Sequence, residues 1–246
     1  MPLRFVQVNV QAVDPSRLGR YWAEAVGWEV TADMPDEVNI QPAGFTYPDP
    51  SALVIDVVPV QEPKTAKNRI HLDLASLSTE HQGETMRRLQ ALGAVPVDIG
   101  QGDVPWTVLA DLEGNEFCVL DPRPIYQDTG PIGAVVVDCA DPAAMARFWS
   151  AATDWTVHDV RADWAALRSS SGIGPYVEFI GTPEVKAVQN RLHLDLRPYP
   201  GDDHMAEVDR LRTLGATDAD IGQTGEEPWT VLADPEGNEF CVLTPK

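Results

Sequence analysis

One segment of this chain occurs twice with a single change. Residues 105–120 read PWTVLADLEGNEFCVL, and residues 228–243 repeat them with Pro235 in place of Leu112. A near-identical copy at a long separation indicates a duplicated unit, which constrains the fold more than composition does. Each copy predicts a β-hairpin, because β-branched and aromatic residues flank turn-forming Gly and Asn residues. We therefore expect two related domains.

A second pattern surrounds the hairpins: one strand, one helix and three strands. Residues 4–10 alternate apolar and polar side chains, as a half-buried strand does. Asp14 and Pro15 then begin a helix that Gly27 ends. The same order restarts near Arg69, Ala134 and Arg191. The sequence thus predicts an α+β fold of four βαβββ modules in two tandem domains, residues 1–124 and 131–246, separated by a turn-rich linker. The short link within each half makes pairing of the first module with the second, and of the third with the fourth, the simplest arrangement.

Charge and composition exclude some classes of partner. The formal net charge is −20 and the pI is about 4.4, which argues against nucleic acid or an anionic membrane surface as a partner. No basic start leads into an apolar segment, and no run reaches the roughly 20 apolar residues of a membrane span. The three cysteines do not form a disulfide framework. We expect a cytoplasmic protein, monomeric or homodimeric.

These features together resemble a known superfamily. The four modules, the Asp-Pro helix starts, the strand RLHLDL around His193 and the turn DPEGNEF are similar to the glyoxalase/bleomycin-resistance/dioxygenase (vicinal oxygen chelate) superfamily. The resemblance implies two glyoxalase-like domains, each with a curled mixed sheet forming a cup and with helices outside. It implies no single activity, because isomerases, dioxygenases and drug-binding proteins share this scaffold.

The resemblance also implies positions for metal ligands on the first and last strands of each module. These positions hold Gln7, Asp56, His71 and Cys118 in the first domain, and Ala134, Glu178, His193 and Cys241 in the second. Cys118 and Cys241 stand where a Glu is usual, and Ala134 cannot bind a metal. The remaining N, O and S donors suit zinc better than magnesium or calcium. The cofactor is therefore expected to be either none or one divalent ion of Zn, Fe, Mn or Ni. Without a metal, the histidines are hydrogen-bonded core residues and the cysteines pack as small apolar groups.

Other polar and aromatic residues are candidates for the same cups. His71 and Asp73, like His193 and Asp195, lie two apart on a strand and so face one side, which makes each histidine a candidate general base oriented by its aspartate. Ligand-binding candidates are Trp106, Glu116, Trp229, Glu239 and Trp164; the alternative is that the tryptophans belong to the core and the carboxylates to a solvated rim. The first strand carries Gln7 and Asn9 in one domain but Ala134 and Val136 in the other, which predicts unequal cups. We expect the second cup, with Trp155 and Trp164, to bind an apolar or aromatic small molecule, and the first to have a polar site that is either catalytic or vestigial.

Three classes of function follow from these residues. The first is a lyase, isomerase or dioxygenase-like enzyme that acts on a small organic molecule with a histidine base or a divalent metal. The second is a non-catalytic protein that sequesters a drug or natural product, as in bleomycin resistance. The third is a structural or regulatory protein whose cups are closed by side chains. The polar His-x-Asp and Glu-x-Cys pairs favour the first two classes, because a filled core would keep an apolar alternation.

Overall fold

The computed structural model describes residues 2–245 and has the predicted order of strand, helix and three strands, four times over. The first module contains β1 (Arg4–Ala12), α1 (Pro15–Val26), β2 (Glu29–Met34), β3 (Glu37–Gln41) and β4 (Val54–Pro59). The second contains β5 (Ile70–Leu74), α2 (Thr79–Ala91), β6 (Val95–Pro96), β7 (Thr107–Ala110) and β8 (Glu116–Val119). The predicted α+β class is confirmed.

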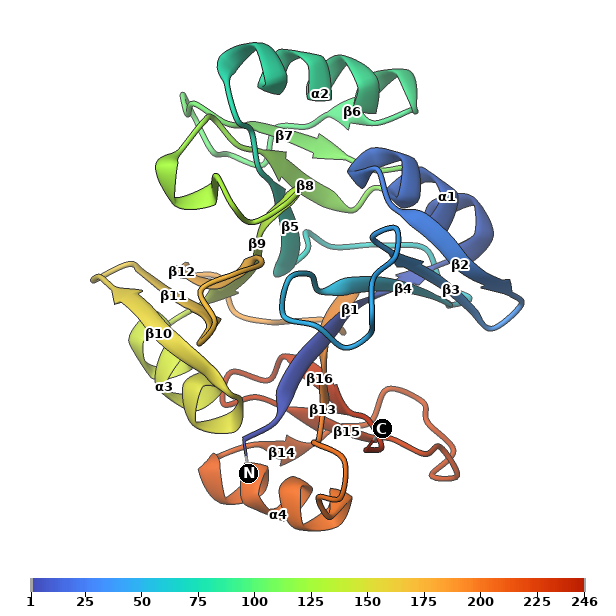
Figure 1. The fold of residues 1–246 in the computed structure, drawn as a ribbon, viewed down its shortest axis with the longest axis vertical. Coiled ribbons are helices and arrows are strands. Elements are labelled where there is room, and N and C mark those ends of the chain that lie inside the picture. Colours follow the sequence, from blue (N-terminus) through green and yellow to red (C-terminus); the bar gives the residue numbers. More distant parts are fainter. Residues whose placement is uncertain (1, 246) are drawn as a thin grey trace.

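The second half of the chain repeats this order after a short 3-10 helix, η1 (Pro124–Tyr126), in the linker. The third module contains β9 (Ile132–Cys139), α3 (Pro142–Ala152), β10 (Trp155–Val160), β11 (Trp164–Ser169) and β12 (Tyr176–Gly181). The fourth contains β13 (Leu192–Arg197), α4 (His204–Leu214), β14 (Thr217–Asp218), β15 (Thr230–Ala233) and β16 (Glu239–Val242). Helices α2 and α4 lie at opposite ends of the long axis, with the strands between them (Figure 1).

Local sequence sets the helix boundaries. The Asp14 side chain accepts a hydrogen bond from the Arg17 backbone N–H at 3.1 Å, and Pro15 occupies the first turn of α1. Gly27 ends this helix in the left-handed region, with φ of 72°, which a residue with a Cβ adopts only at a cost. Asp141 caps α3 in the same way as Asp14 caps α1.

The strands form two eight-stranded sheets, and the pairing of modules differs from the expected one. Sheet I has the order β14-β15-β16-β13-β1-β4-β3-β2, so it joins the first module to the fourth. Sheet II has the order β10-β11-β12-β9-β5-β8-β7-β6 and joins the second module to the third. The expected pairing of the first module with the second, and of the third with the fourth, is therefore wrong.

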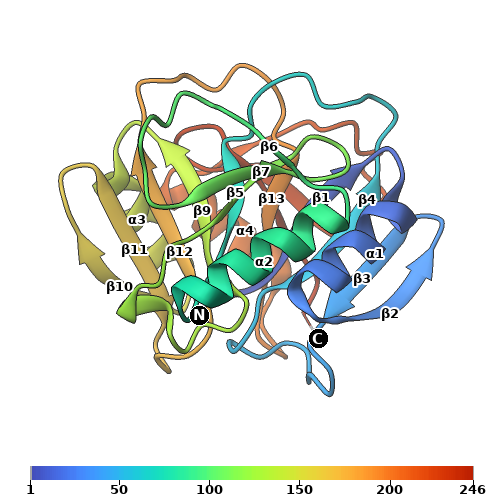
Figure 2. The same ribbon diagram turned by 90° about the horizontal axis from the view of Figure 1, so that it is seen from above.

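Two crossover segments explain why modules that are adjacent in the sequence do not share a sheet. Residues 60–69 connect β4 of sheet I to β5 of sheet II, and residues 182–191 connect β12 of sheet II to β13 of sheet I. At up to about 3.3 Å per residue, a segment of this length easily spans two packed sheets. The two segments run close together along one edge of the molecule (Figure 2), where they line a shared cavity of about 380 Å³.

The sheets pack through a common core that both halves of the chain supply. The ring centroids of Trp22 on α1 and Phe117 on β8 are 5.0 Å apart, and those of Trp149 on α3 and Phe240 on β16 are also 5.0 Å apart. The indole N–H of Trp22 also donates to Asp111 at 3.1 Å. Each helix therefore joins its own sheet to a hairpin of the other sheet.

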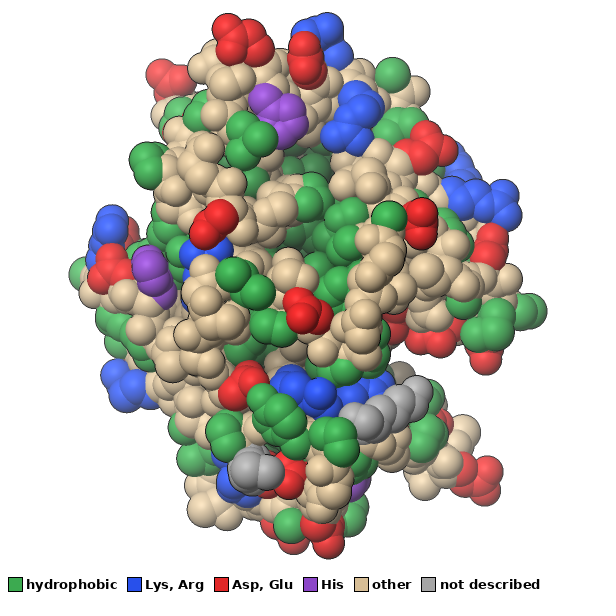
Figure 3. All heavy atoms as spheres, in the orientation of Figure 1, with side chains coloured by type: hydrophobic (Ala, Val, Ile, Leu, Met, Phe, Trp, Pro, Cys, Tyr) green, Lys and Arg blue, Asp and Glu red, His purple; other side chains and the backbone are tan. Residues whose placement is uncertain are grey.

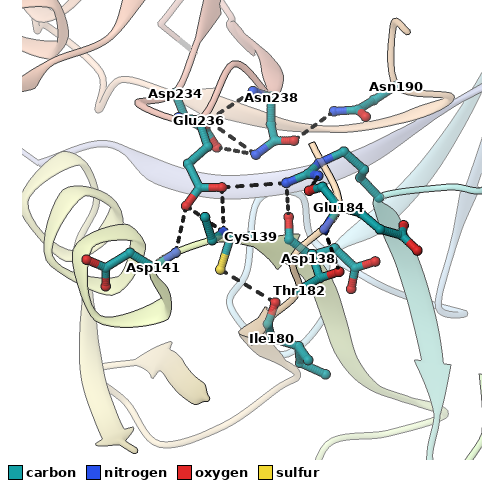
Figure 4. A network of polar contacts seen from close by, with 12 residues as sticks. Asp138, Cys139, Asp141, Ile180, Thr182, Glu184, Asn190, Asp234, Glu236 and Asn238 are labelled. Carbon is teal, nitrogen blue, oxygen red and sulfur yellow. Dashed lines mark hydrogen bonds and ion pairs between the residues drawn. The ribbon is translucent and has the colours of Figure 1, made fainter. Parts of the chain in front are cut away.

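Hairpin turns reinforce these contacts at the helix starts. Glu236, in the turn between β15 and β16, accepts hydrogen bonds from the backbone N–H groups of Ala140 (2.7 Å) and Asp141 (2.9 Å) at the start of α3 (Figure 4). Glu113 accepts from Val13 and Asp14 in the same way, both at 2.8 Å. A carboxylate at a helix N-terminus satisfies unpaired donors and complements the helix dipole.

The face of the molecule in Figure 3 carries charged groups of both signs. On the face shown in Figure 3, acidic side chains lie at several separate places, interspersed with apolar and basic groups. None of the helices within residues 2–245 combines the length and the apolar character needed to cross a bilayer.

Candidate functional site

Each sheet curls into a cup, and the cup faces combine residues from both halves of the chain. Cup I is the concave face of sheet I, where Asn9 pairs with both His193 on β13 and Asp56 on β4. Cup II is the concave face of sheet II, where Val136 pairs with both His71 on β5 and Glu178 on β12. Because side chains alternate along a strand, these residues share a face with their second neighbours.

The eight ligand positions implied by the resemblance are therefore grouped differently from the expectation. Cup I contains Gln7, Asp56, His193 and Cys241, whereas cup II contains Ala134, Glu178, His71 and Cys118. The expected grouping within each half is wrong because β1 pairs with β13, and β5 with β9. Strand β1, which carries the polar residues Gln7 and Asn9, thus belongs to cup I, and strand β9, which carries Ala134 and Val136, belongs to cup II.

A cluster of His, Asp and Cys recurs at the base of both cups. In cup I, His193 Nε2 lies 3.2 Å from Asp195 Oδ1 and 3.5 Å from Cys241 Sγ. In cup II, His71 Nε2 lies 3.4 Å from Asp73 Oδ1, and Cys118 completes the group. In each cluster the three donor atoms lie within 4.8 Å of one another. The predicted neighbourhood of His and Asp therefore exists in both cups.

Burial and the neighbouring aspartates together determine the pKa values of the histidines and cysteines in these clusters. Burial alone opposes a charge on His193, but the adjacent Asp195 carboxylate outweighs it and raises the pKa of the imidazole well above its ordinary value. Burial likewise opposes a charge on His71, and its hydrogen bond with Asp73 raises that pKa. Burial, followed by the charge of the nearby aspartate, raises the pKa of Cys118 and Cys241. These thiols are neutral, which argues against a nucleophilic role.

The clusters fit a small divalent ion in their donor chemistry. One N, one O and one S donor converge in each cup, where the Oδ1 atoms of Asp73 and Asp195 lie 3.4 and 3.2 Å from the Nε2 atoms of His71 and His193. Such a mixed set suits zinc, and three protein ligands leave a position for another ligand. Among residues 2–245, neither Asp56 nor Glu178 joins these groups. The donors that converge are thus not the quartets that the resemblance implies.

Cup I has an open cavity of about 440 Å³ above the His193 cluster. Its lining includes polar groups from five parts of the chain, namely Gln7, Asn39, Tyr47, Asp56 and Arg197, together with Trp229 as an aromatic wall. Trp229 remains 41% exposed. Small-molecule pockets typically have this size and combine apolar walls with a few convergent polar groups.

A chain of hydrogen bonds separates this cavity from the cluster below. Arg197 Nε donates to the Tyr47 hydroxyl at 3.1 Å, and this hydroxyl donates to Gln7 Oε1 at 3.0 Å. Gln7 Nε2 in turn donates to Asp195 Oδ2 at 2.9 Å. Gln7 therefore lines the cavity with one end and holds the cluster with the other. Its bonds orient the site, although none of them needs a metal.

Asp56 is a buried titratable group in the lining of the cavity. Burial raises its pKa to about 8, although Asn39 Nδ2 donates to its Oδ1 at 2.8 Å and favours the charged form; the neighbouring Glu37 carboxylate raises the pKa further. Near neutral pH this carboxyl is therefore largely protonated. It can then both donate to and accept from a bound molecule.

Cup II differs from cup I because side chains fill it. The hydroxyl of Tyr126, from η1 in the linker, donates to Glu178 Oε1 at 2.7 Å, and Trp164 Nε1 donates to Glu178 Oε2 at 3.0 Å. The Tyr126 ring also packs edge-on against Tyr176, with ring centroids 6.0 Å apart. The candidate residues Glu178 and Trp164 thus bind each other and Tyr126.

The other predicted ligand-binding residues lie at the edges of the cups. Glu116 accepts from Lys64 at 2.7 Å, and Glu239 accepts from Lys186 at 2.6 Å, so both carboxylates hold crossover segments. Trp106 lies beneath the guanidinium of Arg123, 5.5 Å from its ring centroid. Its repeat partner Trp229 lines the cavity of cup I.

Sequence reasoning missed several residues of the site, chiefly Tyr47, Arg197, Asn39 and Tyr126. Tyr47 and Tyr126 come from irregular segments whose composition indicates only turns. Arg197 and Asn39 could have been predicted from the sequence. Arg197 lies two residues after Asp195 on the same strand face, and Asn39 is a polar residue inside a strand.

Comparison with known proteins agrees with this architecture of four βαβββ modules and two cups. The family model described as "Glyoxalase-like domain" matches the chain twice, over residues 7–120 and 134–243. The chain therefore belongs to the glyoxalase-like family, as the sequence resemblance indicated. A search of curated proteins found no match.

Solved structures show the same fold at low sequence identity. Glyoxalase I from Zea mays has a TM-score of 0.68 and 14% identity over 98% of this chain and 92% of that chain. A putative dioxygenase from Bacillus subtilis subsp. subtilis str. 168 has a TM-score of 0.64 and 11% identity over 99% of this chain and 85% of that chain. At these identities the likeness shows the fold alone.

Proposed function

We propose that this glyoxalase-like protein binds a small organic molecule in cup I. The observation that carries the proposal is the cavity of about 440 Å³, in which side chains of the first and fourth modules converge. Arg197 and Asn39 carry hydrogen-bond donors, the Tyr47 hydroxyl can accept, and Trp229 supplies an aromatic face. A ligand with an aromatic or apolar body and one or more oxygen atoms would match this lining.

The arrangement supports binding more strongly than metal-dependent turnover. The lining described for the cavity contains Gln7 but not His193, Asp195 or Cys241. Gln7 lies between a bound molecule and the donors that would hold an ion, since it bonds Asp195 directly. A divalent ion held by these three residues would act there as a Lewis acid. For a ligand to reach it, the Gln7 side chain would have to move aside.

A second candidate function is proton transfer to the bound molecule, as in a lyase or isomerase. Asp56 favours it, because its carboxyl lines the cavity and its pKa of about 8 is close to ordinary working pH. A group with such a pKa is matched to general acid–base catalysis. Asn39 would orient this carboxyl through its hydrogen bond to Oδ1. His193 is less well placed as the base, because it lies below Gln7.

Calorimetric titration with a panel of small aromatic oxygen compounds tests the proposal. We expect one site per chain, and we expect Trp229→Ala to weaken binding about tenfold through loss of the aromatic wall. Trp106→Ala, the same change at the repeat-related residue of the filled cup II, is the matched control and should leave the affinity unchanged. Equal losses in both variants, or no binding by any compound, would contradict the proposal.

Liquid chromatography coupled to mass spectrometry, applied to the same mixtures, separates the two candidate functions, because it resolves isomers as well as cleavage products. A non-catalytic binder returns every compound unchanged. A proton-transfer enzyme produces an isomer or a cleavage product, and Asp56→Asn should abolish this product while Trp229 still reports binding.

A further inference from the structure

Because the chain is internally duplicated, the two cups can be compared position by position. In cup I, Gln7 on β1 pairs with Asp195 on one side and Val54 on the other. In cup II, Ala134 on β9 pairs in the same way with Asp73 and Tyr176. The same registers make Asp56 of cup I the counterpart of Glu178 in cup II. Equivalent positions in the two cups can therefore be compared directly.

In cup II the place above Glu178 is occupied by a phenol that belongs to the chain. Tyr126 is 4% exposed, its hydroxyl donates to Glu178 at 2.7 Å, and its ring packs against Tyr176. The same apolar cluster includes Leu120, with Trp106 packed against it. The scaffold thus holds an aromatic ring with its hydroxyl directed at the β12 carboxylate.

In cup I the equivalent place is a cavity. Its lining includes Val54, Asp56, Trp229 and Leu243, which are the counterparts of Tyr176, Glu178, Trp106 and Leu120. In cup II, Glu178 and Tyr176 contact Tyr126 directly, and Leu120 and Trp106 belong to the same apolar cluster. Tyr47 also enters cup I, but its hydroxyl bonds Gln7 and Arg197 rather than Asp56. The groups that surround a phenol in one cup therefore surround open space in the other.

We infer that the ligand of cup I is a phenolic aromatic compound whose hydroxyl hydrogen-bonds to Asp56, in the place that Tyr126 fills in cup II. This inference rests on the proposed function, because it names the class of molecule that cup I binds. Asn39 supplies the second bond to this carboxyl, as Trp164 does for Glu178.

Two differences between the cups indicate that the ligand is larger than a single phenol. Val54 stands where Tyr176 packs against the Tyr126 ring, which leaves more room above Asp56. Trp229 lines the cavity, whereas Arg123 covers the ring of Trp106. A fused or extended ring system could then contact Trp229 while its hydroxyl reaches Asp56, within a cavity of about 440 Å³.

The test compares three compounds of similar size on the wild-type protein by calorimetry: 2-naphthol, 2-methoxynaphthalene and decahydro-2-naphthol. The second lacks the donor hydrogen and the third lacks the aromatic ring. We expect 2-naphthol to bind about tenfold more tightly than 2-methoxynaphthalene, because the ether cannot donate a hydrogen bond to the buried carboxyl. It should also bind more tightly than decahydro-2-naphthol, which keeps the hydroxyl but has no aromatic ring to pack on Trp229. Asp56→Leu should reduce its affinity to that of 2-methoxynaphthalene.

A variant of cup II provides an independent readout of the same recognition. Tyr126→Gly removes the built-in phenol, and p-cresol, which is the missing side chain, should raise the melting temperature of this variant. The same compound should have no such effect on Tyr126→Phe, in which the ring remains. If p-cresol does not stabilise the glycine variant, the cup scaffold does not recognise a free phenol, and the inference for cup I is contradicted.

The outcomes distinguish the inference from the proposed function. Equal affinities for 2-naphthol and 2-methoxynaphthalene, both sensitive to Trp229→Ala, would overturn the phenol assignment and leave cup I as a binding site. No binding in cup I by any compound of the wider panel would overturn both.

Discussion

At the scale of single residues, the two cups differ mainly in what surrounds one carboxyl group. Glu178 receives hydrogen bonds from Tyr126 and Trp164, whereas Asp56 receives one from Asn39 and lines a cavity. Cup II therefore satisfies its carboxylate internally. In cup I, desolvation raises the pKa of Asp56, and a ligand can supply the remaining contact.

The raised pKa of Asp56 predicts a specific pH dependence of stability. Its pKa is about 8 in the folded chain and 3.8 as the ordinary value, so the native state binds more protons between these limits. The free energy of unfolding should therefore fall as the pH rises from about 4 to about 8. Asp56→Asn keeps the acceptor for Asn39 but cannot ionise. This variant should lose less unfolding free energy over that pH range than the wild type, by an amount on the order of a few kcal/mol, at about 1.4 kcal/mol per pKa unit.

Urea denaturation at pH 5 and pH 8 measures this difference. Asp36→Asn, which changes an exposed carboxyl in the turn between β2 and β3, is the control. If Asp56→Asn and the wild type lose stability equally between the two pH values, Asp56 is not the buried acid described here.

At this scale the sequence predicted which side chains lie near one another. The His-x-Asp pairs and both cysteines are clustered as expected, because alternation along a strand fixes which side chains share a face. The positions of Tyr126 and Tyr47 could not be predicted, since they depend on how irregular segments fold back over the sheets. No local pattern encodes that path.

At the scale of elements, the hairpin turns act as caps for helices in the neighbouring module. Glu236 accepts from the backbone N–H groups of Ala140 and Asp141, the two residues just before α3, and pairs with Arg69 at 3.5 Å. One side chain thus holds the fourth module, the third and the end of a crossover segment together. Its repeat partner Glu113 caps α1.

Removing this cap should destabilise the whole protein rather than one helix. We expect Glu236→Ala to lower the free energy of unfolding by about 1–2 kcal/mol, as loss of a helix cap does. Glu236→Gln keeps an acceptor and should lose less. Chemical denaturation monitors the change, with the exposed Glu226→Ala as the matched control. A loss no larger than that of the control would show that the turn does not hold α3.

At the scale of the whole molecule, the duplicated halves are not independent units of function. Each cup takes one module from each half, because β1 pairs with β13, and β5 with β9. The sequence predicted four modules and their order, since hydrophobic periodicity and turn residues are local signals. The expected pairing of modules into sheets was wrong, because the crossover segments permit either pairing and no local signal distinguishes the two.

The central claim is that cup I, built from the first and fourth modules, is where this protein binds small molecules. The most direct test is a ¹H–¹⁵N spectrum of the indole N–H groups, recorded while a compound that binds in the calorimetric panel is titrated. The account predicts that the signal of Trp229 shifts to saturation while those of Trp106 and Trp164 remain in place. Shifts of Trp106 and Trp164 with Trp229 unchanged would place the ligand in cup II and contradict the account.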